Sequence, residues 1–514
     1  MKVLVVEPQK PCRVQEINSL ADMQRIVGGD IEAVYPFQDS AALVCNAEGK
    51  LLGLPMNRPL LDEDRLPYDI ICGTFFIAGL GQEDFVSLTD EQIQRYKSLY
   101  DNMQILPVRT AAGEQGRIVG DQHIKKKGKS TMRDKYILTA ESVTEGHPDK
   151  LCDTIADSVL DACLKGDSSA HVACEVLATA GKVLVAGEIS AKVMPDIPSI
   201  ACRTIREAGY TGLDYEIEAI THDQSDDIAY AVREGVQTGA GDQGIMYGFA
   251  CDETESYLPL PVILAHRLTR LLTNARKTGM IQGLRPDGKA QVSVEYNFDI
   301  PVRLASVVLS CQHDPEKDLD QLREELMDHV IQPALQELPP DADTEILINP
   351  SGRFVYGGFE ADTGLTGRKL MVDTYGGLAP HGGGALSGKD ATKVDRSGAY
   401  MARYIAKNIV SAGLADRCTV TLAYAIGKAE PVAANVDTDG TGEYRDEVLE
   451  QAVRAVFDLT PAGMRHTLGL DKPIFAQFCN YGHFTHPDAP WEQTEKAEVL
   501  CNACRIKEAG VSDR

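Results

Sequence analysis

Two glycine-rich segments follow each other between residues 362 and 395, and each of them leads into basic side chains. The first reads Asp-Thr-Gly-Leu-Thr-Gly before Arg368 and Lys369, and the second reads His-Gly-Gly-Gly-Ala-Leu-Ser-Gly before Lys389. Glycine lets a backbone approach a ligand closely and expose its N–H groups, which favours oxyanion binding. Carboxylates at Asp362, Asp390 and Asp395 interleave with these cations. Because Mg²⁺ prefers carboxylate and phosphate oxygens, the stretch predicts a site for a polyphosphate with Mg²⁺.

A P-loop is disfavoured, although residues 383–389 satisfy its G-x-x-x-x-G-K pattern. The next residue is Asp390, so the Ser or Thr hydroxyl that a P-loop offers to Mg²⁺ is missing. The preceding Ala379, Pro380 and His381 also do not form the apolar strand that must feed such a loop. A solvent-exposed loop with scattered charges remains the structural alternative.

The whole chain has the composition of a soluble globular protein with three to four domain-sized units. It has 514 residues, of which 43% are hydrophobic and 25% charged. The net charge of −25 argues against nucleic acid as a partner. No apolar run is long enough for a membrane span, and no signal-peptide pattern is present, so we expect a cytoplasmic protein. Thirteen scattered cysteines indicate reduced thiols, and the single C-x-x-C at Cys501 and Cys504 is weak support for a metal or redox site.

Residues 1–100 are predicted to form a small separate α/β domain, because strand-like runs alternate there with helical segments at 20–27 and 87–100. This part resembles a small domain family of unknown function, and it shows no catalytic pattern. Its expected role is regulation or binding of an unknown ligand or partner. Residues 101–135 combine glycines with a lysine-rich run and are expected to be a flexible linker.

Three further acids stand out at the start of the main body. The turn Gly-His-Pro-Asp-Lys places His147, Asp149 and Lys150 at the N-terminus of a predicted helix over 151–164, where N–H groups favour an anion. Alternatively, Asp149 only caps this helix. Glu175 and Glu188 each lie alone within apolar strand-like runs, where a carboxylate is costly unless it is paired or binds a cation. An edge position in a strand is the structural alternative for each of them.

Other polar groups follow at the ends of predicted elements. Asp287 and Lys289 precede a strand at 291–296, and Arg353 lies beside Phe354, whose ring could stack on a base. The polar residues from 221 onward, followed by glycines at 239–244, are a candidate lid. Helices and strands alternate in α+β fashion without a strict sequence repeat.

Taken together, these motifs resemble one family, the S-adenosylmethionine synthetases (methionine adenosyltransferases). The match covers about residues 137–500 and rests on the segments at 146–150, 239–248, 284–287, 364–369 and 382–390. The resemblance implies a core of three similar α/β units with pseudo-threefold arrangement, at about 136–240, 241–370 and 371–505. It also implies a homodimer or homotetramer with active sites between subunits.

The resemblance further implies roles for single residues. Two Mg²⁺ ions would be held by Asp149 and Asp395, and one K⁺ ion by Glu175. Methionine would be held by Glu188, Gln224, Asp362 and Lys393. ATP would be held by His147, Asp287, Lys289, Arg353, Phe354, Asp362, Arg368, Lys369, Ala385 and Lys389. Of these, the catalytic set would be His147, Lys289, Arg368, Lys369 and Lys389.

The implied reaction is an alkyl transfer in which methionine sulfur attacks C5′ of ATP and expels triphosphate, which is then hydrolysed to pyrophosphate and phosphate. A neutral sulfur nucleophile needs alignment and stabilisation of the leaving charge, and no general base. A kinase or ATPase is a second hypothesis, and Asp390 in place of a P-loop hydroxyl argues against it. A third is a catalytically degenerate nucleotide or S-adenosylmethionine sensor regulated by the N-terminal domain. Loss of a cation or carboxylate would favour the sensor, and all of them are present.

Overall fold

The computed structural model describes residues 1–8, 10–37, 39–61, 67–81, 84–101, 104–110, 113–119, 135–212, 214–223, 239–297 and 299–511. The chain divides into two compact units, Met1–Met132 and Arg133–Arg514. Gln224 and most of the candidate lid lie outside the described residues, as does the lysine-rich run. Among the helices that are described, none combines the length and apolar character needed to cross a membrane.

The first unit is built on a six-stranded sheet with the order β2-β1-β7-β4-β3, in which β8 also pairs with β7. Alternate side chains of β1 enter two cores: Leu4 packs in the core that contains Tyr96 of α2 (Asp90–Asp101), and Val3 packs in the core that contains Val27 of α1 (Leu20–Val27). Burial of both faces explains the apolar runs of β1, β4 and β7. The strands are β1 (Lys2–Val6), β2 (Arg13–Glu16), β3 (Ile31–Val34), β4 (Ala41–Asn46), β7 (Phe75–Leu80) and β8 (Phe85–Val86).

Two smaller antiparallel pairs complete the first unit. One joins β5 (Met56–Leu61) to β6 (Pro67–Cys72), and the other joins β9 (Gln104–Thr110) to β10 (Gly113–Val119). The second pair lies within the segment that we expected to be a flexible linker. Its register places Ile105 opposite Ile118, and the glycines nearby do not prevent the two strands from pairing.

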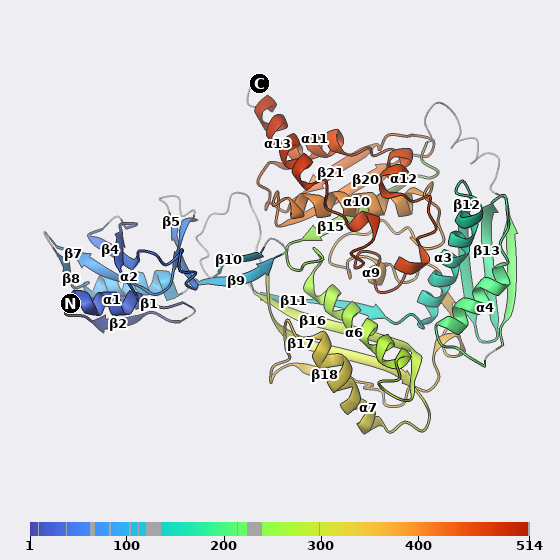
Figure 1. Ribbon diagram of the computed structural model, residues 1–514, viewed down its shortest axis with the longest axis horizontal. Coiled ribbons are helices and arrows are strands. Elements are labelled where there is room, and N and C mark those ends of the chain that lie inside the picture. The colour runs from blue at the N-terminus through green and yellow to red at the C-terminus, as the bar shows by residue number, and fades with distance from the viewer. Residues whose placement is uncertain are drawn as a thin grey trace. The chain divides into compact units, whose positions relative to one another are not determined.

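The described residues of the second unit form three sheets, and the order of elements repeats (Figure 1). Each repeat runs strand, helix, two hairpin strands and helix; the first two add a closing parallel strand, and the third adds a short helix after its first strand. The first repeat has β11 (Lys135–Val143), α3 (Pro148–Gly166), β12 (His171–Thr179), β13 (Lys182–Ser190), α4 (Ile197–Glu207) and β14 (Glu216–His222). The second has β15 (Gly244–Cys251), α6 (Leu260–Lys277), β16 (Leu284–Asn297), β17 (Ile300–His313), α7 (Leu319–Leu326) and β18 (Glu345–Ile348). The third has β19 (Gly364–Leu365), α9 (Leu370–Asp373), α10 (Val394–Ser411), β20 (Arg417–Tyr424), β21 (Ala433–Asp437) and α11 (Asp446–Val456).

The first strand of every repeat leaves its own repeat and joins the sheet of another. β11 pairs with β16, β15 with β20, and β19 with β12, each in antiparallel orientation. The result is a cyclic exchange of strands among three sheets, β11-β16-β17-β18, β14-β13-β12-β19 and β15-β20-β21. The predicted α+β core of three similar units is confirmed.

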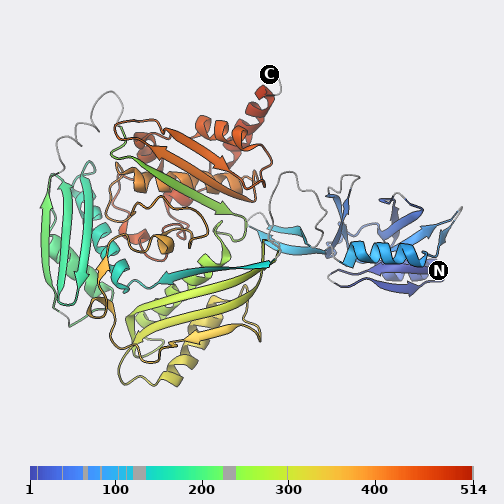
Figure 2. The same ribbon diagram turned by 180° about the vertical axis from the view of Figure 1, so that it is seen from behind.

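One long helix of each repeat, α3, α6 or α10, lies on the inner side of a sheet, around the short helix α9 (Figures 1 and 2). The C-terminal part adds α12 (Pro461–Leu468) and α13 (Ala497–Val511) beside α10. α13 contains both Cys501 and Cys504, and its Cys504 is buried in the core, which fits a structural role for this C-x-x-C.

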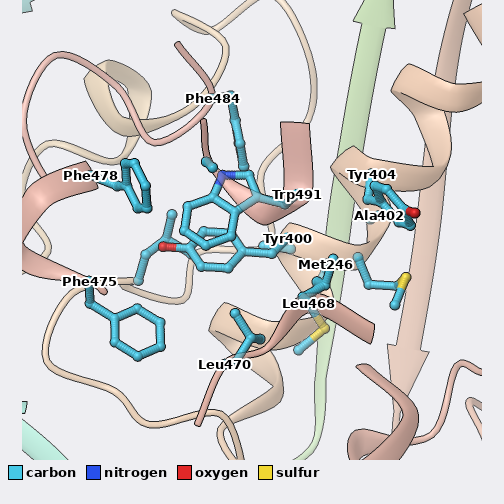
Figure 3. Close-up of a cluster of buried hydrophobic side chains, with 14 of the residues drawn as sticks. Met246, Tyr400, Ala402, Tyr404, Leu468, Leu470, Phe475, Phe478, Phe484 and Trp491 are labelled. Atoms are coloured by element: carbon cyan, nitrogen blue, oxygen red, sulfur yellow. The ribbon is translucent and has the colours of Figure 1, made fainter. Parts of the chain in front are cut away.

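An aromatic cluster anchors the C-terminal segment to α10. Trp491 is fully buried, and its ring stacks on Tyr400 of α10 with centroids 3.7 Å apart (Figure 3). Trp491 Nε1 donates to the carbonyl of His483 at 2.7 Å, and His483 Nδ1 is hydrogen-bonded to the Tyr400 hydroxyl at 2.8 Å. Further rings surround this pair, namely those of Phe475, Phe478 and Phe484. The cluster fixes α10, whose first turn carries Asp395.

Candidate functional site

The first part of the site is the N-terminus of α3. His147 is the N-cap residue, and its Nδ1 accepts a hydrogen bond from the Asp149 N–H at 3.2 Å. The preceding Gly146 is required by close packing, because a Cβ there would lie 2.4 Å from the Pro286 Cβ. Burial, aided by the charges of Lys369 and other lysines, lowers the pKa of His147 to about 3. The imidazole is therefore neutral at physiological pH and acts here as an acceptor.

The first glycine-rich turn wraps around Asp149. The buried carboxylate accepts from the Leu365 N–H at 3.0 Å and from Lys369 Nζ at 2.6 Å. Arg368 Nε lies 3.7 Å from the same carboxylate. Strand β19, which opens the turn, pairs with the edge of β12. Two predicted phosphate cations thus lie against one predicted Mg²⁺ carboxylate at a helix N-terminus.

The second turn repeats this arrangement. Lys389 Nζ lies 2.5 Å from the Asp395 carboxylate, and Lys389 forms an isolated antiparallel bridge with Ala173 on the same edge of β12. The two turns touch each other, because a Cβ added to Gly367 would lie 2.5 Å from the Cβ of Ala385. The structure therefore brings the predicted residues of both turns together.

A third element brings Asp287 and Lys289 to the same helix N-terminus. The Thr144 hydroxyl donates to the Pro286 carbonyl at 2.7 Å, which ties the start of β16 to the turn before α3. Lys289 Nζ lies 2.5 Å from the carboxylate of Glu141 on β11. Asp287 is buried, accepts from the Gly358 N–H at 2.9 Å, and has its pKa raised to about 6 by burial.

The charges of the two turns fit a magnesium polyphosphate. Each predicted Mg²⁺ carboxylate, Asp149 or Asp395, is paired with a predicted phosphate cation, Lys369 or Lys389. Among the residues that the structure describes, no group of three or more His, Cys, Asp or Glu side chains could hold a metal. Mg²⁺ is commonly bound by one or two carboxylates together with substrate phosphates, so the residues present fit Mg²⁺ that arrives with phosphate.

The remaining predicted residues have contacts of their own. Glu188 lies 3.4 Å from Nε2 of His222 on the neighbouring strand β14. Lys393 Nζ donates to the buried Asp390 at 3.0 Å. Four more residues were predicted as ligands. Arg353 donates to the Pro315 carbonyl, and the Phe354 N–H donates to His313. Asp362 accepts from the Thr363 N–H, and Glu175 is exposed on β12.

Lys150 differs from the expectation that it would face an anion at the helix N-terminus. Its ammonium is completely buried and lies 2.6 Å from Asp373 and 3.1 Å from Asp153. A buried ammonium needs carboxylate partners, and these two supply them. Lys150 therefore forms ion pairs in the protein interior next to the site.

Three acids of α3 were missed by the sequence reasoning, namely Asp153, Asp157 and Asp161. Together with Asp149 they recur every four residues, which places all four near one face of the helix. The sequence contains this four-residue spacing, which could have indicated the acids. It was overlooked because the apolar residues between them are sufficient to predict the helix.

The imidazole of His147 gives a testable pH dependence. An exposed histidine has a pKa near 6.5, so the unfolded chain binds the proton more readily than the folded chain. The stability contributed by neutral His147 is present above pH ~6.5 and is lost as the pH falls toward 3. The check is the free energy of unfolding, measured with urea between about pH 7 and 5. As the pH falls, we expect this free energy to decrease in the wild type by about 1 kcal/mol per pH unit more than in His147→Gln. The control is His222→Gln, at an exposed imidazole; equal slopes for wild type and His147→Gln would contradict the burial of His147.

Comparisons with protein-family models agree with the division of the chain. Residues 1–101 match a domain of unknown function (DUF3846). Residues 135–231, 237–354 and 356–493 match the N-terminal, central and C-terminal domains of S-adenosylmethionine synthetase, in that order. These three matches contain the turn before α3, the start of β16 and both glycine-rich turns. The chain therefore belongs to the S-adenosylmethionine synthetase family and carries a domain of unknown function before its synthetase domains.

Proposed function

We propose that this chain is a methionine adenosyltransferase that forms S-adenosyl-L-methionine from ATP and L-methionine and then hydrolyses the triphosphate. The observation that carries the proposal is the meeting of two glycine-rich turns at the N-terminus of α3, each with a lysine paired to an acid. A triphosphate needs several cations at once, and this arrangement offers them from separate elements of one compact unit.

In the proposed transfer, the methionine sulfur forms a bond to C5′ while the bond from C5′ to the triphosphate oxygen breaks. Negative charge then grows on the leaving group, and fixed cations aimed at it lower the barrier. Lys369 and Lys389 exchange their carboxylate partners for phosphate oxygens. Arg368 and Lys289, whose side chains are more exposed, add further positive charge. Mg²⁺, when bound by Asp149 and Asp395, neutralises part of the charge on the triphosphate. The same cations serve the hydrolysis that follows.

The substrate ends are assigned by charge and shape. Glu188 would take the methionine ammonium and Lys393 its carboxylate, with Gln224 and Asp362 beside them. Neutral His147 would donate or accept a hydrogen bond near the reacting centre, because burial keeps its pKa low. Glu175 would hold one K⁺ ion. The remaining ATP ligands would be Asp287, Arg353, Phe354 and Ala385.

We also propose a homodimer or homotetramer with active sites between subunits. The exposed side chains of the β12–β14 sheet include Glu175, Leu177 and Ile220, whereas α3 and α4 pack against the same sheet. Exposed aliphatic residues on one face of a sheet favour a second copy of the chain. Light scattering at several concentrations would test this, and a monomer at all of them would reject it.

The deciding experiment supplies ATP, methionine, Mg²⁺ and K⁺, and measures all three products. Formation of S-adenosylmethionine with pyrophosphate and phosphate would establish the proposed activity. The full chain should be compared with residues 132–514, because Arg133–Arg514 form a separate compact unit. Activity in the shorter chain alone would identify the first unit as an inhibitor. Binding of ATP without product from either chain would favour a sensor.

A role of Asp149 in Mg²⁺ binding can be separated from a purely structural role, since His147 and not Asp149 caps α3. We expect Asp149→Asn to raise the Mg²⁺ concentration at half-maximal activity by about tenfold, because one charged ligand oxygen is lost. Asp196→Asn is the matched control, since Asp196 caps α4 by accepting from the Ser199 N–H at 3.2 Å. A Mg²⁺ titration that is the same for wild type and Asp149→Asn would leave Asp149 with only its structural contacts to Leu365 and Lys369.

A further inference from the structure

The four acids along α3 each accept a hydrogen bond from the backbone of a loop segment. Asp149 accepts from the Leu365 N–H, as described above. Asp161 accepts from the N–H groups of Phe475 and Ala476, both at 2.9 Å. Between them lie Asp153 and Asp157, both completely buried, and these two reach the glycine-rich turns.

Asp153 fixes the first turn at its last glycine. Its Oδ1 accepts from the Gly367 N–H at 2.8 Å, and Gly367 directly precedes Arg368 and Lys369. The backbone of Gly367 has φ +74°, which glycine adopts without strain. The other oxygen, Oδ2, lies 3.1 Å from Lys150 Nζ, so the buried charge is compensated.

Asp157 fixes the second turn in the same manner. Its Oδ1 accepts from the Gly388 N–H at 2.8 Å, and Gly388 directly precedes Lys389. Gly388 has φ +80°, and a Cβ there would lie 2.0 Å from the Cys174 carbonyl. Both oxygens of Asp157 also accept from Arg396 at 2.7 Å, and this guanidinium lies 4.2 Å from the centre of the Phe475 ring.

The edge of β12 holds both turns from the opposite side. The Thr366 N–H donates to the Val176 carbonyl at 3.0 Å, and the Cys174 N–H donates to the Gly388 carbonyl at 2.9 Å. Each turn is therefore held by a strand edge on one side and by a carboxylate of α3 on the other. Successive acids on α3 are separated by about 6 Å along the helix axis, which sets the offset between the two turns.

We propose that Asp153 and Asp157 are positioning residues, which set the spacing between the cations of the two turns to match neighbouring phosphates of a polyphosphate chain. The inference deepens the proposed function and rests on it for the identity of the substrate. The arrangement itself can be tested with inorganic tripolyphosphate and Mg²⁺ alone, which do not require that any product is formed.

The experiment compares Asp153→Ala with Asp161→Ala in the full chain. Both substitutions remove a buried acceptor of a loop N–H from the same helix, but only the first releases a cation-bearing turn. We expect Asp153→Ala to weaken binding of tripolyphosphate by about a hundredfold, the size of effect that a misplacement of about 1 Å has on catalytic rates. Asp161→Ala should lower the melting temperature similarly and leave this binding within about twofold of wild type. Asp153→Asn should restore most of the affinity, because its amide oxygen can still accept from Gly367.

A second variant covers the case in which Asp153→Ala does not fold. Asp153→Ser keeps a polar atom near Lys150 but is one bond too short to reach Gly367. Wild-type affinity in a folded Asp153→Ser or Asp153→Ala would overturn the proposal, as would an equal loss in Asp161→Ala. Wild-type protein that binds tripolyphosphate but makes no S-adenosylmethionine would reject the proposed function, and the comparison of variants would still stand.

Discussion

Replacing Lys389 by alanine is expected to slow both S-adenosylmethionine synthesis and triphosphate hydrolysis by roughly a hundredfold to a thousandfold. Lys389 supplies a charge that is needed most when triphosphate leaves, so the loss should fall on kcat more than on KM for methionine. The folded chain should tolerate the change, because the side chains of Lys389 and of its partner Asp395 are both partly exposed. Rapid-quench measurement of both steps in wild type and variant gives the two rates separately.

The matched control for Lys389→Ala is Lys317→Ala. Lys317 is also largely buried and ion-paired, with its Nζ 2.6 Å from Glu325, but it lies before α7 and away from both turns. Near-wild-type rates in Lys389→Ala would remove this lysine from the site. A loss of the same size in Lys317→Ala would mean that any loosened ion pair slows the enzyme.

Replacing Glu492 by glutamine is expected to cost about 3–5 kcal/mol of unfolding free energy. Its carboxylate accepts from Arg403 at 2.8 Å on both oxygens and from Lys407 at 2.7 Å, and all three side chains are buried. Burial lowers the pKa of Lys407, and the charge of Glu492 opposes that effect. Without the carboxylate, two cations remain in the core next to the Tyr400–Trp491 stack. Urea unfolding followed by tryptophan fluorescence reports on this region directly, because the chain has one tryptophan.

Glu325→Gln provides the comparison for Glu492→Gln. The Glu325–Lys317 pair has the same chemistry at 2.6 Å, but its carboxylate is 24% exposed, so we expect a loss below about 1 kcal/mol. A loss this small in Glu492→Gln as well would show that the backbone carbonyls around Arg403, which also accept from it, are sufficient to hold the two charges.

The sequence was most informative where chemistry is concentrated in short segments. The two glycine-rich turns, the turn at His147 and the cations Lys369 and Lys389 could be predicted, because glycine and charge in such combinations have few other uses. The ion pairs that hold them could not, since Lys369 and Asp149 are 220 positions apart. Lys150 shows the same limit: only the position of Asp373 reveals that its charge is satisfied inside the protein.

Some elements were obscured by local composition. The β9–β10 pair lies within the segment expected to be a linker, because the glycines and lysines there were more prominent than the strand pattern. The spacing of Asp153 and Asp157 was present in the sequence, but its meaning depends on loops that come more than 200 residues later. The cyclic exchange of strands likewise depends on pairings between distant parts of the chain.

That exchange bears on how the protein emerges from the ribosome. The edge of β12 is completed by residues that follow it by about 190 positions, as the hydrogen bond between Val176 and Thr366 shows. At typical translation rates this interval lasts about 10 to 40 seconds, during which an unpaired apolar strand edge is open to other chains. The segments that finally cover the edge are the two cation-bearing turns. A nascent chain therefore covers this exposed strand edge in the same step in which the candidate site is assembled, so arrest of translation before residue 390 should leave a product that depends on chaperones.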